Sequence, residues 1–442
     1  MTEVNNQTMK GGAMSVEDNN PVLKGRAHAW VVTISAAFFF FYIFIQMNFF
    51  SAIEPALFDR FHIGAAKMAS VSQMYFYGNV LFLIPAGLLL DYFSTRRLLL
   101  VSTLICVLST WWFARSGSLI QAEIARFFIG MAGAFCLLGP VRLATRWFPP
   151  AKIALVVGVV VTMAMVGGMV AQTPFVLLAN KFGCSKALYT DVVLGIVIWF
   201  LIFANVQDNP SSQSVDSHEA HPSNPFGVLK AVSLVVKNKQ NWLAGLYASL
   251  VNLPVFWLGG FWGVNYLVQV HHLSRVGASS VNGMIFLGLI VGCPLFGWWS
   301  DTMKKRKPPM IIGAIAAFVA SLIVIWFGVL SYWALFVLFF IIGLAISSQV
   351  IAYPVVAESN PLTLTGSAES VASVLIMAGG FTLSLFAWLL NYDGGGVVVH
   401  SVPVYSPMQY HIALSALLVA FFLALMLVLG LRETNCQACT DG

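Results

Sequence analysis

Long runs of apolar residues, broken by short polar or charged segments, fill most of this chain. A helix needs about 20 mostly apolar residues to cross about 30 Å of hydrocarbon. The runs that meet this length predict twelve membrane-spanning helices, near residues 30–53, 69–90, 97–115, 120–141, 152–178, 188–206, 242–268, 279–299, 309–329, 333–355, 366–391 and 410–431. The pattern therefore predicts an all-α polytopic membrane protein.

A polar segment in the middle of the chain divides these runs into two sets of six. It begins with a stretch rich in Ser, Asn and Pro that is typical of disorder. Phe226, Leu229, Val232 and Val236 then fall on one face of a short amphipathic helix, which we expect on the membrane surface. The predicted organisation is a polar tail over 1–28, a six-helix half over 29–206, a linker over 207–241, a six-helix half over 242–431 and a tail over 432–442.

Composition supports a membrane location. Hydrophobic residues make up 59% of the chain and charged residues 9%, whereas soluble domains carry about 45–50% and about 25%. The first 28 residues contain no apolar segment of the kind that a cleavable signal peptide requires. Of the 23 Lys and Arg residues, 16 fall on the side that holds both termini, 6 on the other side and 1 within a span. The positive-inside rule then predicts cytoplasmic termini for a protein of the inner membrane, and it explains the net charge of +6 without nucleic acid.

A charged motif occurs twice, between the second and third span of each half. "GLLLDYFSTRR" and "GWWSDTMKKRK" lie 210 residues apart. Each has a glycine, an aspartate four residues later and a basic pair five and six residues beyond. We expect the glycines to let a neighbouring helix approach closely, and the aspartates to meet the positive N-terminus of a helix in the other half. The residues are Gly87, Asp91, Arg96 and Arg97 in the first copy and Gly297, Asp301, Arg306 and Lys307 in the second.

With these motifs the chain resembles the major facilitator superfamily of secondary transporters. "RFFIGMAGA", from Arg126 to Ala134, resembles the family's fourth-span motif, and "RWFPPAKIALVVG" and "AESNPLTLTGSAES" resemble the segments before its fifth and eleventh helices. The resemblance implies two pseudo-symmetric six-helix halves that alternate access to a central site. It also implies a latch in the outward-facing state, in which Asp91 meets the start of the eleventh helix near residues 367–370 and Asp301 meets the start of the fifth.

Ionisable groups inside spans are functional candidates, because burying them in lipid is costly. Arg126 in the fourth span is predicted to bind a substrate carboxylate, and Glu54 at the outer end of the first span is a candidate for proton coupling; structural roles at the interface and in helix packing are the alternatives. Polar and aromatic positions add candidate substrate-binding residues: Tyr42, Gln46, Asn48, Tyr77, Asn252, Trp257, Gln349 and Tyr353.

Other polar residues have simpler interpretations. We expect Glu358 and Glu369 to form salt bridges with Arg142 and Arg146 across the halves. His271 and His272 are assigned to a solvated loop. Cys436 and Cys439 form a CxxC in the tail without the further ligands that zinc requires, so no metal site is predicted. No phosphate-binding loop and no catalytic constellation is present, so we expect neither ATP nor another cofactor, and no enzymatic activity.

The first two spans resemble a branch of the superfamily from intracellular bacteria, the phagosomal transporter-like carriers of amino acids and nucleosides. We therefore expect a monomeric, proton-coupled importer of a small polar solute, preferably an amino acid, because one arginine suits one carboxylate. Import of a nucleoside or a ferric carboxylate siderophore, and drug export, are alternative transport functions. A nutrient receptor that binds without transporting is the alternative from another class.

Overall fold

The computed structural model describes residues 21–61, 65–148, 150–209, 233–361, 365–392, 397–399 and 402–437. Within them, twelve helical spans are long and apolar enough to cross a membrane, which confirms the predicted number. Helices suit this solvent because they satisfy their own backbone hydrogen bonds where no water is available. The predicted surface helix lies largely outside the described residues.

The first six spans are built from nine helices. They are α1 (Pro21–Asn48), α2 (Phe50–Phe61), α3 (Ala65–Tyr92), α4 (Thr95–Arg115), α5 (Leu119–Gly133), α6 (Leu138–Trp147), α7 (Pro150–Val170), α8 (Thr173–Phe182) and α9 (Cys184–Asn205). Of these, α2 is a short helix between the first two spans, and α1 begins within the segment that was predicted as a polar tail.

The last six spans contain more helix breaks, including one π-helix. They are α11 (Lys239–Val251), η2 (Val255–Trp262), α12 (Gly263–Gln269), α13 (Arg275–Met303), α14 (Lys307–Trp326), α15 (Tyr332–Ile346), η3 (Ser347–Ile351), α16 (Ala352–Glu358), α17 (Thr365–Ala378), η5 (Gly379–Thr382), α18 (Leu383–Leu390) and α19 (Pro407–Gly430). A two-stranded antiparallel hairpin, β1 (Val397–Val399) and β2 (Val402–Val404), precedes α19.

Breaks within the spans have local chemical causes. Pro174 follows the break between α7 and α8, and Pro254 precedes η2 in the seventh span. Proline removes a backbone donor and clashes with the preceding turn, so a helix ends or changes its winding there. The eleventh span changes to a 3₁₀ turn at the pair Gly379–Gly380. Discontinuous helices of this kind are common near the binding sites of transporters.

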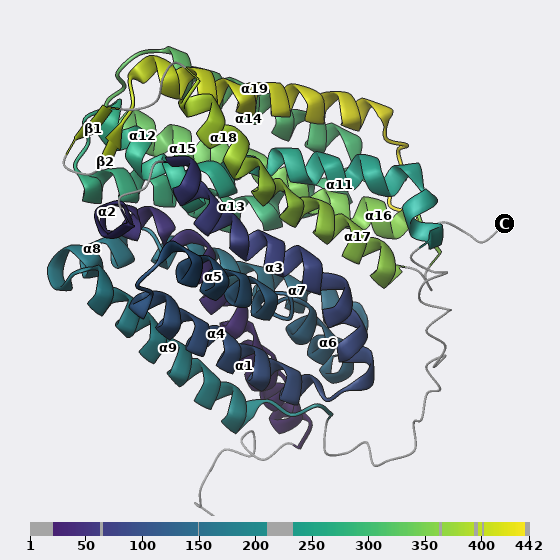
Figure 1. Cartoon of the computed structure of the whole chain (residues 1–442). Helices are drawn as coiled ribbons and strands as arrows, with labels where there is room; N and C mark the ends of the chain where they lie inside the picture. Colours follow the sequence, from purple (N-terminus) through teal and green to yellow (C-terminus); the bar gives the residue numbers. More distant parts are fainter. Residues whose placement is uncertain are drawn as a thin grey trace, which may run out of the picture.

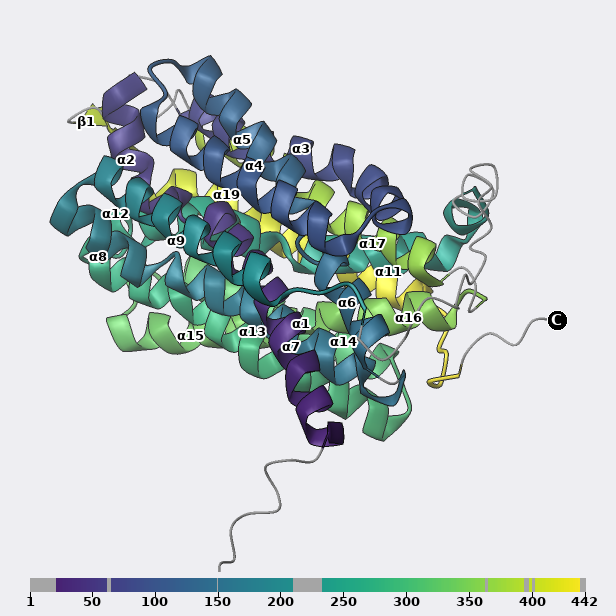
Figure 2. The ribbon, with the colours of Figure 1, turned by 90° about the horizontal axis from the view of Figure 1, so that it is seen from below.

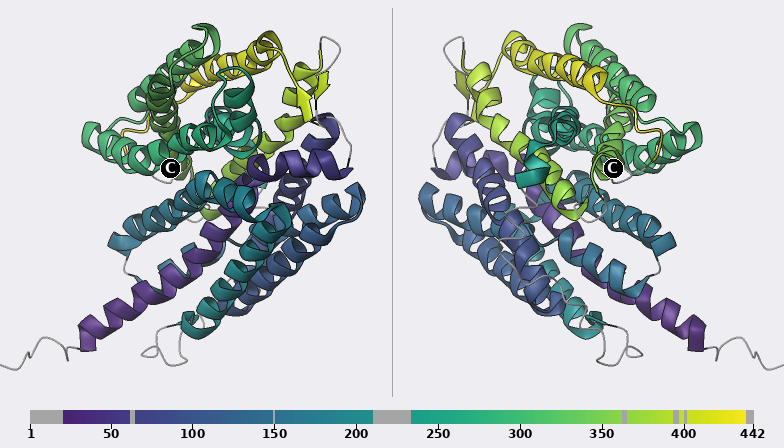
Figure 3. Two further views of the ribbon diagram at one scale, coloured as in Figure 1. Left: turned by 90° about the vertical axis from the view of Figure 1, so that its left-hand side faces the viewer. Right: turned by 90° about the vertical axis from the view of Figure 1, so that its right-hand side faces the viewer.

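The same helix pairs recur in both halves. In the first half α3 packs on α5, α1 on α7 and α4 on α9; in the second half α13 packs on α15, α11 on α17 and α14 on α19. These are the equivalent spans of the two sets of six, so the structure confirms two pseudo-symmetric six-helix halves. Figure 3 shows the halves as two bundles, one purple to blue and the other green to yellow, and α7 and α3 of the first half contact α13, α17 and α18 of the second.

Glycines set the closest helix contacts, at equivalent places in the two halves. A Cβ added to Gly78 would lie 2.1 Å from the carbonyl oxygen of Phe127, and one added to Gly130 would lie 1.8 Å from that of Tyr75. In the second half, Gly288 of α13 faces the carbonyl oxygen of Phe340 equally closely, and Gly343 of α15 faces that of Ile285. Small residues allow this approach between membrane helices.

The motif glycines do not have this role, which corrects the sequence prediction. A Cβ on Gly87 or Gly297 would meet no atom within 4 Å, apart from the surrounding turns of the same helix. These two glycines lie where α3 and α13 extend beyond their closest neighbours. The packing role belongs instead to Gly78 and Gly288, nine residues earlier in each helix.

The bundle has two distinct ends. Figures 1 and 2 show α2, α8 and β1 at one end, which we call the hairpin end, and α16 at the other. The turns α3–α4 and α13–α14 hold the two charged motifs at the second end, which we call the basic end.

Candidate functional site

Arg126 lies in the interior of the first half, close to the hairpin end. Ser118 caps the start of α5 by accepting a hydrogen bond from the backbone N–H of Gln121, and Arg126 follows seven residues after the first residue of the helix. At 1.5 Å per residue this places it about 10 Å inside the helix end. Its side chain is completely buried.

One nitrogen of the Arg126 guanidinium is paired and two are not. Nη1 donates to the backbone carbonyl of Gln46 at 2.7 Å. The guanidinium carbon lies 5.8 Å, 5.5 Å and 5.3 Å from the ring centres of Phe49, Phe50 and Tyr75. Among the residues that the structure describes, the buried Nε and Nη2 have no hydrogen-bond partner. Such a cation is attracted to the ring faces but retains two directed donors for an anion.

Asp191 is the second ionisable group of this interior, and the sequence analysis missed it. It lies seven residues after the start of α9, at a similar depth to Arg126, and it is 3% exposed. The signal was present, because "YTDVVLG" places an acidic residue inside the predicted sixth span. Gln46 Nε2 donates to Asp191 Oδ2, whereas Asp191 Oδ1 is buried without a partner.

Gln46 connects the two charges. Its backbone carbonyl accepts from Arg126, its side-chain amide donates to Asp191, and its side-chain oxygen accepts from Thr110 Oγ1 at 3.2 Å. Tyr42, one turn earlier in α1, faces Asp191 and packs against Gly195. The structure thus brings together Tyr42, Gln46 and Arg126 of the predicted residues and adds Asp191 and Thr110. We call these five residues the polar cluster.

At the described positions of the second half that are equivalent to Arg126 and Asp191, no charged residue is found. Seven residues after the start of α15 and of α19 stand Phe339 and Leu414, both buried. The two halves therefore share a backbone arrangement but differ in chemistry. This asymmetry makes the polar cluster a candidate functional site.

The polar residues predicted in the second half form separate contacts. Gln349 Nε2 donates to Asn252 Oδ1 at 2.9 Å, close to the middle of their spans, and Tyr353 is half-buried one turn beyond Gln349. Trp257 Nε1 donates to Thr382 Oγ1 at 2.8 Å. These residues belong to α11, η2, η3, α16 and η5 rather than to the polar cluster.

Aromatic pairs separate the polar cluster from the second half. Phe50 stacks on Phe261 with ring centres 5.0 Å apart, and Phe76, next to Tyr75, meets Phe256 at 5.0 Å. Of the other predicted site residues, Asn48 donates to the carbonyl of Phe44 at 2.8 Å, and Tyr77, 41% exposed, stacks on Phe381 with ring centres 4.7 Å apart. Arg126 is thus one layer of rings away from the other half.

Hydrogen bonds join the halves at the same level. Gln73 Nε2 donates to the carbonyl of Phe381 at 2.6 Å, and Gln73 Oε1 accepts from Ser384 at 2.6 Å. On the other side of the seam, Gln172 Nε2 donates to the carbonyl of Gly259 at 2.7 Å, and Gln172 Oε1 accepts from Asn282 Nδ2 at 2.9 Å. The halves are held together toward the hairpin end.

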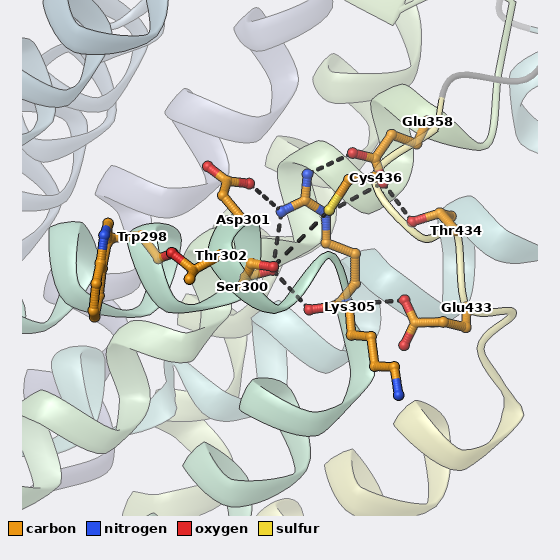
Figure 4. A network of polar contacts seen from close by, with 10 residues as sticks. Trp298, Ser300, Asp301, Thr302, Lys305, Glu358, Glu433, Thr434 and Cys436 are labelled. Carbon is orange, nitrogen blue, oxygen red and sulfur yellow. Dashed lines mark hydrogen bonds and ion pairs between the residues drawn. The ribbon is translucent and has the colours of Figure 1, made fainter.

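At the basic end, Figure 4 shows a polar network that includes Ser300, Asp301 and Glu358. Arg306 bonds all three of these residues. Its Nη1 meets Asp301 Oδ1 at 2.6 Å and its Nη2 meets Glu358 Oε1 at 2.5 Å. Burial acts to lower the pKa of Arg306, but the hydrogen bonds to Glu358 and Asp301 outweigh it and hold the pKa above its usual value. In this conformation Asp301 is 69% exposed and bonded within its own half. Glu358 pairs with Arg306 and Thr434, which corrects its predicted salt bridge to Arg142 or Arg146.

Acidic residues that follow the last span of each half cap its third span. Glu433 accepts from the backbone N–H groups of Arg306 and Lys307 at 2.7 Å and 3.0 Å. At the equivalent place Asp208 accepts from the backbone N–H of Arg96 at 2.9 Å and bonds Ser94. Sequence reasoning missed both caps, because it assigned these acids to a linker and a tail.

The other predicted site and tail residues lie at the basic end or outside the described residues. The side chains of Glu54 and Asp91 and all of Cys439 lie outside the described residues. Arg97 is exposed, and its backbone N–H donates to Ser94 Oγ at 3.2 Å. Lys307 Nζ donates to the carbonyl of Leu429 at the end of α19 and to that of Leu431, which follows the helix. Cys436 Sγ lies 3.9 Å from the carbonyl oxygen of Ser300.

His271 differs from its predicted surroundings. It is buried between α12 and α13, where the backbone N–H of Leu330 donates to its Nδ1 at 3.2 Å. Burial, with smaller contributions from His411 and His272, lowers the pKa of His271 to about 4. The assignment to a solvated loop is therefore wrong for His271, whereas His272 is exposed.

Comparison with known proteins places this arrangement in a family. The family model described as Major Facilitator Superfamily matches residues 34–384. The chain belongs to the major facilitator superfamily. A solved bacterial homologue of the human lysosomal transporter Spinster, in an inward-facing and unoccupied conformation, has the same fold, with a TM-score of 0.71 over 91% of this chain and 96% of that chain at 14% identity.

Two curated relatives share more of the sequence than this solved structure does. A probable hexose phosphate transport protein of Chlamydia muridarum is 22% identical over 69% of this chain and 72% of its own length. The hexuronate transporter of Bacillus subtilis is 20% identical over 60% of this chain and 62% of its own length. Family and fold identify a multi-pass secondary transporter of a small molecule rather than an enzyme.

Proposed function

We propose that this transporter carries small organic anions and that Arg126 binds their anionic group. The observation that carries the proposal is the pair of buried, unpartnered donors on Arg126. A guanidinium stays charged in a protein, so its unsatisfied donors remain a standing cost until an anion reaches them. Carboxylate and phosphate oxygens match its planar fork.

The names of the relatives support an anionic substrate. The hexose phosphate and hexuronate carriers are named for solutes with a phosphate or a carboxylate group. An amino acid, the substrate preferred from the sequence, shares the carboxylate. Carboxylates come first in our proposal, because the second half contributes no Lys or Arg at the depth of Arg126, and a dianionic phosphate is better matched by two basic residues.

Access to Arg126 requires the halves to separate toward the hairpin end. The aromatic pairs Phe50–Phe261 and Phe76–Phe256 cover the polar cluster, and the hydrogen bonds of Gln73 and Gln172 hold that level closed. We infer that this conformation is inward-facing, with the hairpin end toward the exterior. The termini are then cytoplasmic, in agreement with the positive-inside rule. We propose that the protein is a monomeric, proton-coupled importer of the inner membrane.

Uptake by proteoliposomes tests this function. Radiolabelled amino acids, a hexuronate and a hexose phosphate are supplied with and without an inward proton gradient. Arg126→Ala removes a charge-assisted hydrogen bond worth about 1.5–3 kcal/mol, so we expect uptake to fall about ten- to a hundredfold at low substrate concentration. Arg126→Lys keeps the charge but loses the fork and should restore uptake only in part.

Arg115→Ala is the matched control, because Arg115 is exposed at the same end of the first half and contacts Trp111. It should transport like the unmodified protein. Equal uptake by Arg126→Ala and Arg115→Ala would refute the role of Arg126. Accumulation of a nucleoside or a siderophore, or efflux of a drug, with no anion taken up, would replace the proposed substrate class.

A further inference from the structure

We propose that Asp191 is the carboxyl group that binds and releases the coupled proton. This inference rests on the proposed transport function and goes beyond it, because it assigns the coupling site to α9 rather than to Glu54. Three observations support it: the burial of Asp191, the absence of a cation beside it, and its connection to Arg126 through Gln46.

A carboxylate is costly at this position. Asp191 is 3% exposed, about 10 Å inside the end of a membrane-spanning helix. Within the described part of the chain, its hydrogen-bond partner is the neutral amide of Gln46, and no Lys or Arg forms an ion pair with it. Oδ1 is left with no donor. An unpaired buried charge costs several kcal/mol, whereas a proton on Oδ1 removes the charge.

The groups around Asp191 do not supply a compensating positive charge. Tyr42 from α1 and Cys106 from α4 face it, and both are ordinarily neutral near neutral pH. The basic residues toward this end of α4, α8 and α9 are Arg115, Lys181 and Lys186, and all three are exposed. Arg60 on α2 is also exposed, and it donates to the carbonyl of Ala114 at 3.2 Å. Arg126 on α5 donates to the backbone of Gln46 rather than to Asp191. The resting structure therefore favours the protonated acid.

Gln46 makes proton binding and anion binding interdependent. An anion bound at the free Nε and Nη2 of Arg126 draws the guanidinium toward itself, which weakens the Nη1 hydrogen bond to the Gln46 carbonyl and releases the end of α1. The side chain of Gln46 moves with that backbone, so its hydrogen bond to Asp191 changes too. The proton step itself is simple: water on one side supplies a proton and the Oδ1–H bond forms, and after the halves move this bond breaks and the proton passes to water on the other side. No redox change is involved.

Asp191→Asn tests the assignment, because the amide mimics the protonated acid in shape and charge and cannot release a proton. We expect this variant to lose accumulation driven by a proton gradient but to retain exchange of labelled for unlabelled substrate, since Arg126 is intact. Asp191→Glu keeps a titratable carboxyl and should retain accumulation with a shifted pH dependence. Thr190→Val, next to Asp191 on the exposed face of α9 and outside the polar cluster, is the control and should remain gradient-driven.

Infrared spectroscopy provides a readout that does not depend on the substrate. The difference between unmodified protein and Asp191→Asn at neutral pH should contain the carbonyl band of a protonated carboxyl, identified by its downshift in D₂O. Gradient-driven accumulation by Asp191→Asn, or a difference spectrum without that band, would overturn the proposal. Failure of every anion in uptake and exchange by the unmodified protein would refute the proposed function instead, and the infrared band would still decide the protonation of Asp191.

Discussion

Replacement of Gly130 by alanine is the sharpest test of how the first half is packed. The added Cβ would lie 1.8 Å from the carbonyl oxygen of Tyr75, whereas ordinary contacts begin at 3.4 Å. The obstacle is backbone, which cannot rotate away, so α3 and α5 must separate by about 1.6 Å. A gap of about 0.5–1 Å already forfeits a quarter to a half of the dispersion energy between facing atoms.

The expected cost follows from two opposing contributions. Overpacking of a tight contact costs about 1–3 kcal/mol, and alanine returns up to about 1 kcal/mol of helix propensity. Since this separation exceeds the gap that typical overpacking creates, we expect a net loss of about 2 kcal/mol. The effect should reach function, because Arg126 lies one turn before Gly130 and contacts the ring of the same Tyr75.

Thermal unfolding of the purified protein, followed by tryptophan fluorescence, measures this loss. Gly87→Ala is the matched control on α3, because its Cβ would meet no atom within 4 Å. We expect Gly130→Ala to unfold several degrees lower and to transport more slowly, and Gly87→Ala to be as stable as the unmodified protein or slightly more so. If the two variants unfold at the same temperature, glycine at position 130 does not set the distance between α3 and α5.

The remaining predictions concern the two ends of the bundle. Because His271 has a pKa of about 4 when folded and about 6.5 when unfolded, its contribution to stability should be complete above about pH 6.5 and be lost as the pH falls toward 4. Unfolding temperatures at a series of pH values should show this slope in His272→Gln but not in His271→Gln, and an equal slope in both would contradict it. Glu433→Ala removes the cap of α14 and should cost about 1 kcal/mol, as should Asp208→Ala at the start of α4. Unfolding at neutral pH measures both, and an unchanged temperature would show that the two caps do not contribute to stability.

The sequence by itself determined the scaffold of this transporter. Apolar length predicts each span, because a chain in hydrocarbon must close its backbone hydrogen bonds within a helix. The repeat of "GLLLDYFSTRR" by "GWWSDTMKKRK" showed the two halves. Arg126 stood out for a similarly local reason, as a charge inside an apolar run.

Only the tertiary structure decided which side chains meet. Gln46 and Asp191 are 145 positions apart in the sequence, and Arg306 and Glu358 are 52 positions apart. It also selected Gly78 over Gly87 as the packing glycine of α3 and placed His271 under Leu330. In a water-soluble protein the polar face of each helix would indicate its orientation. Here the lipid and the interior are both apolar, so the spans are apolar on every side, and the direction in which each helix faces is fixed only when the helices pack together.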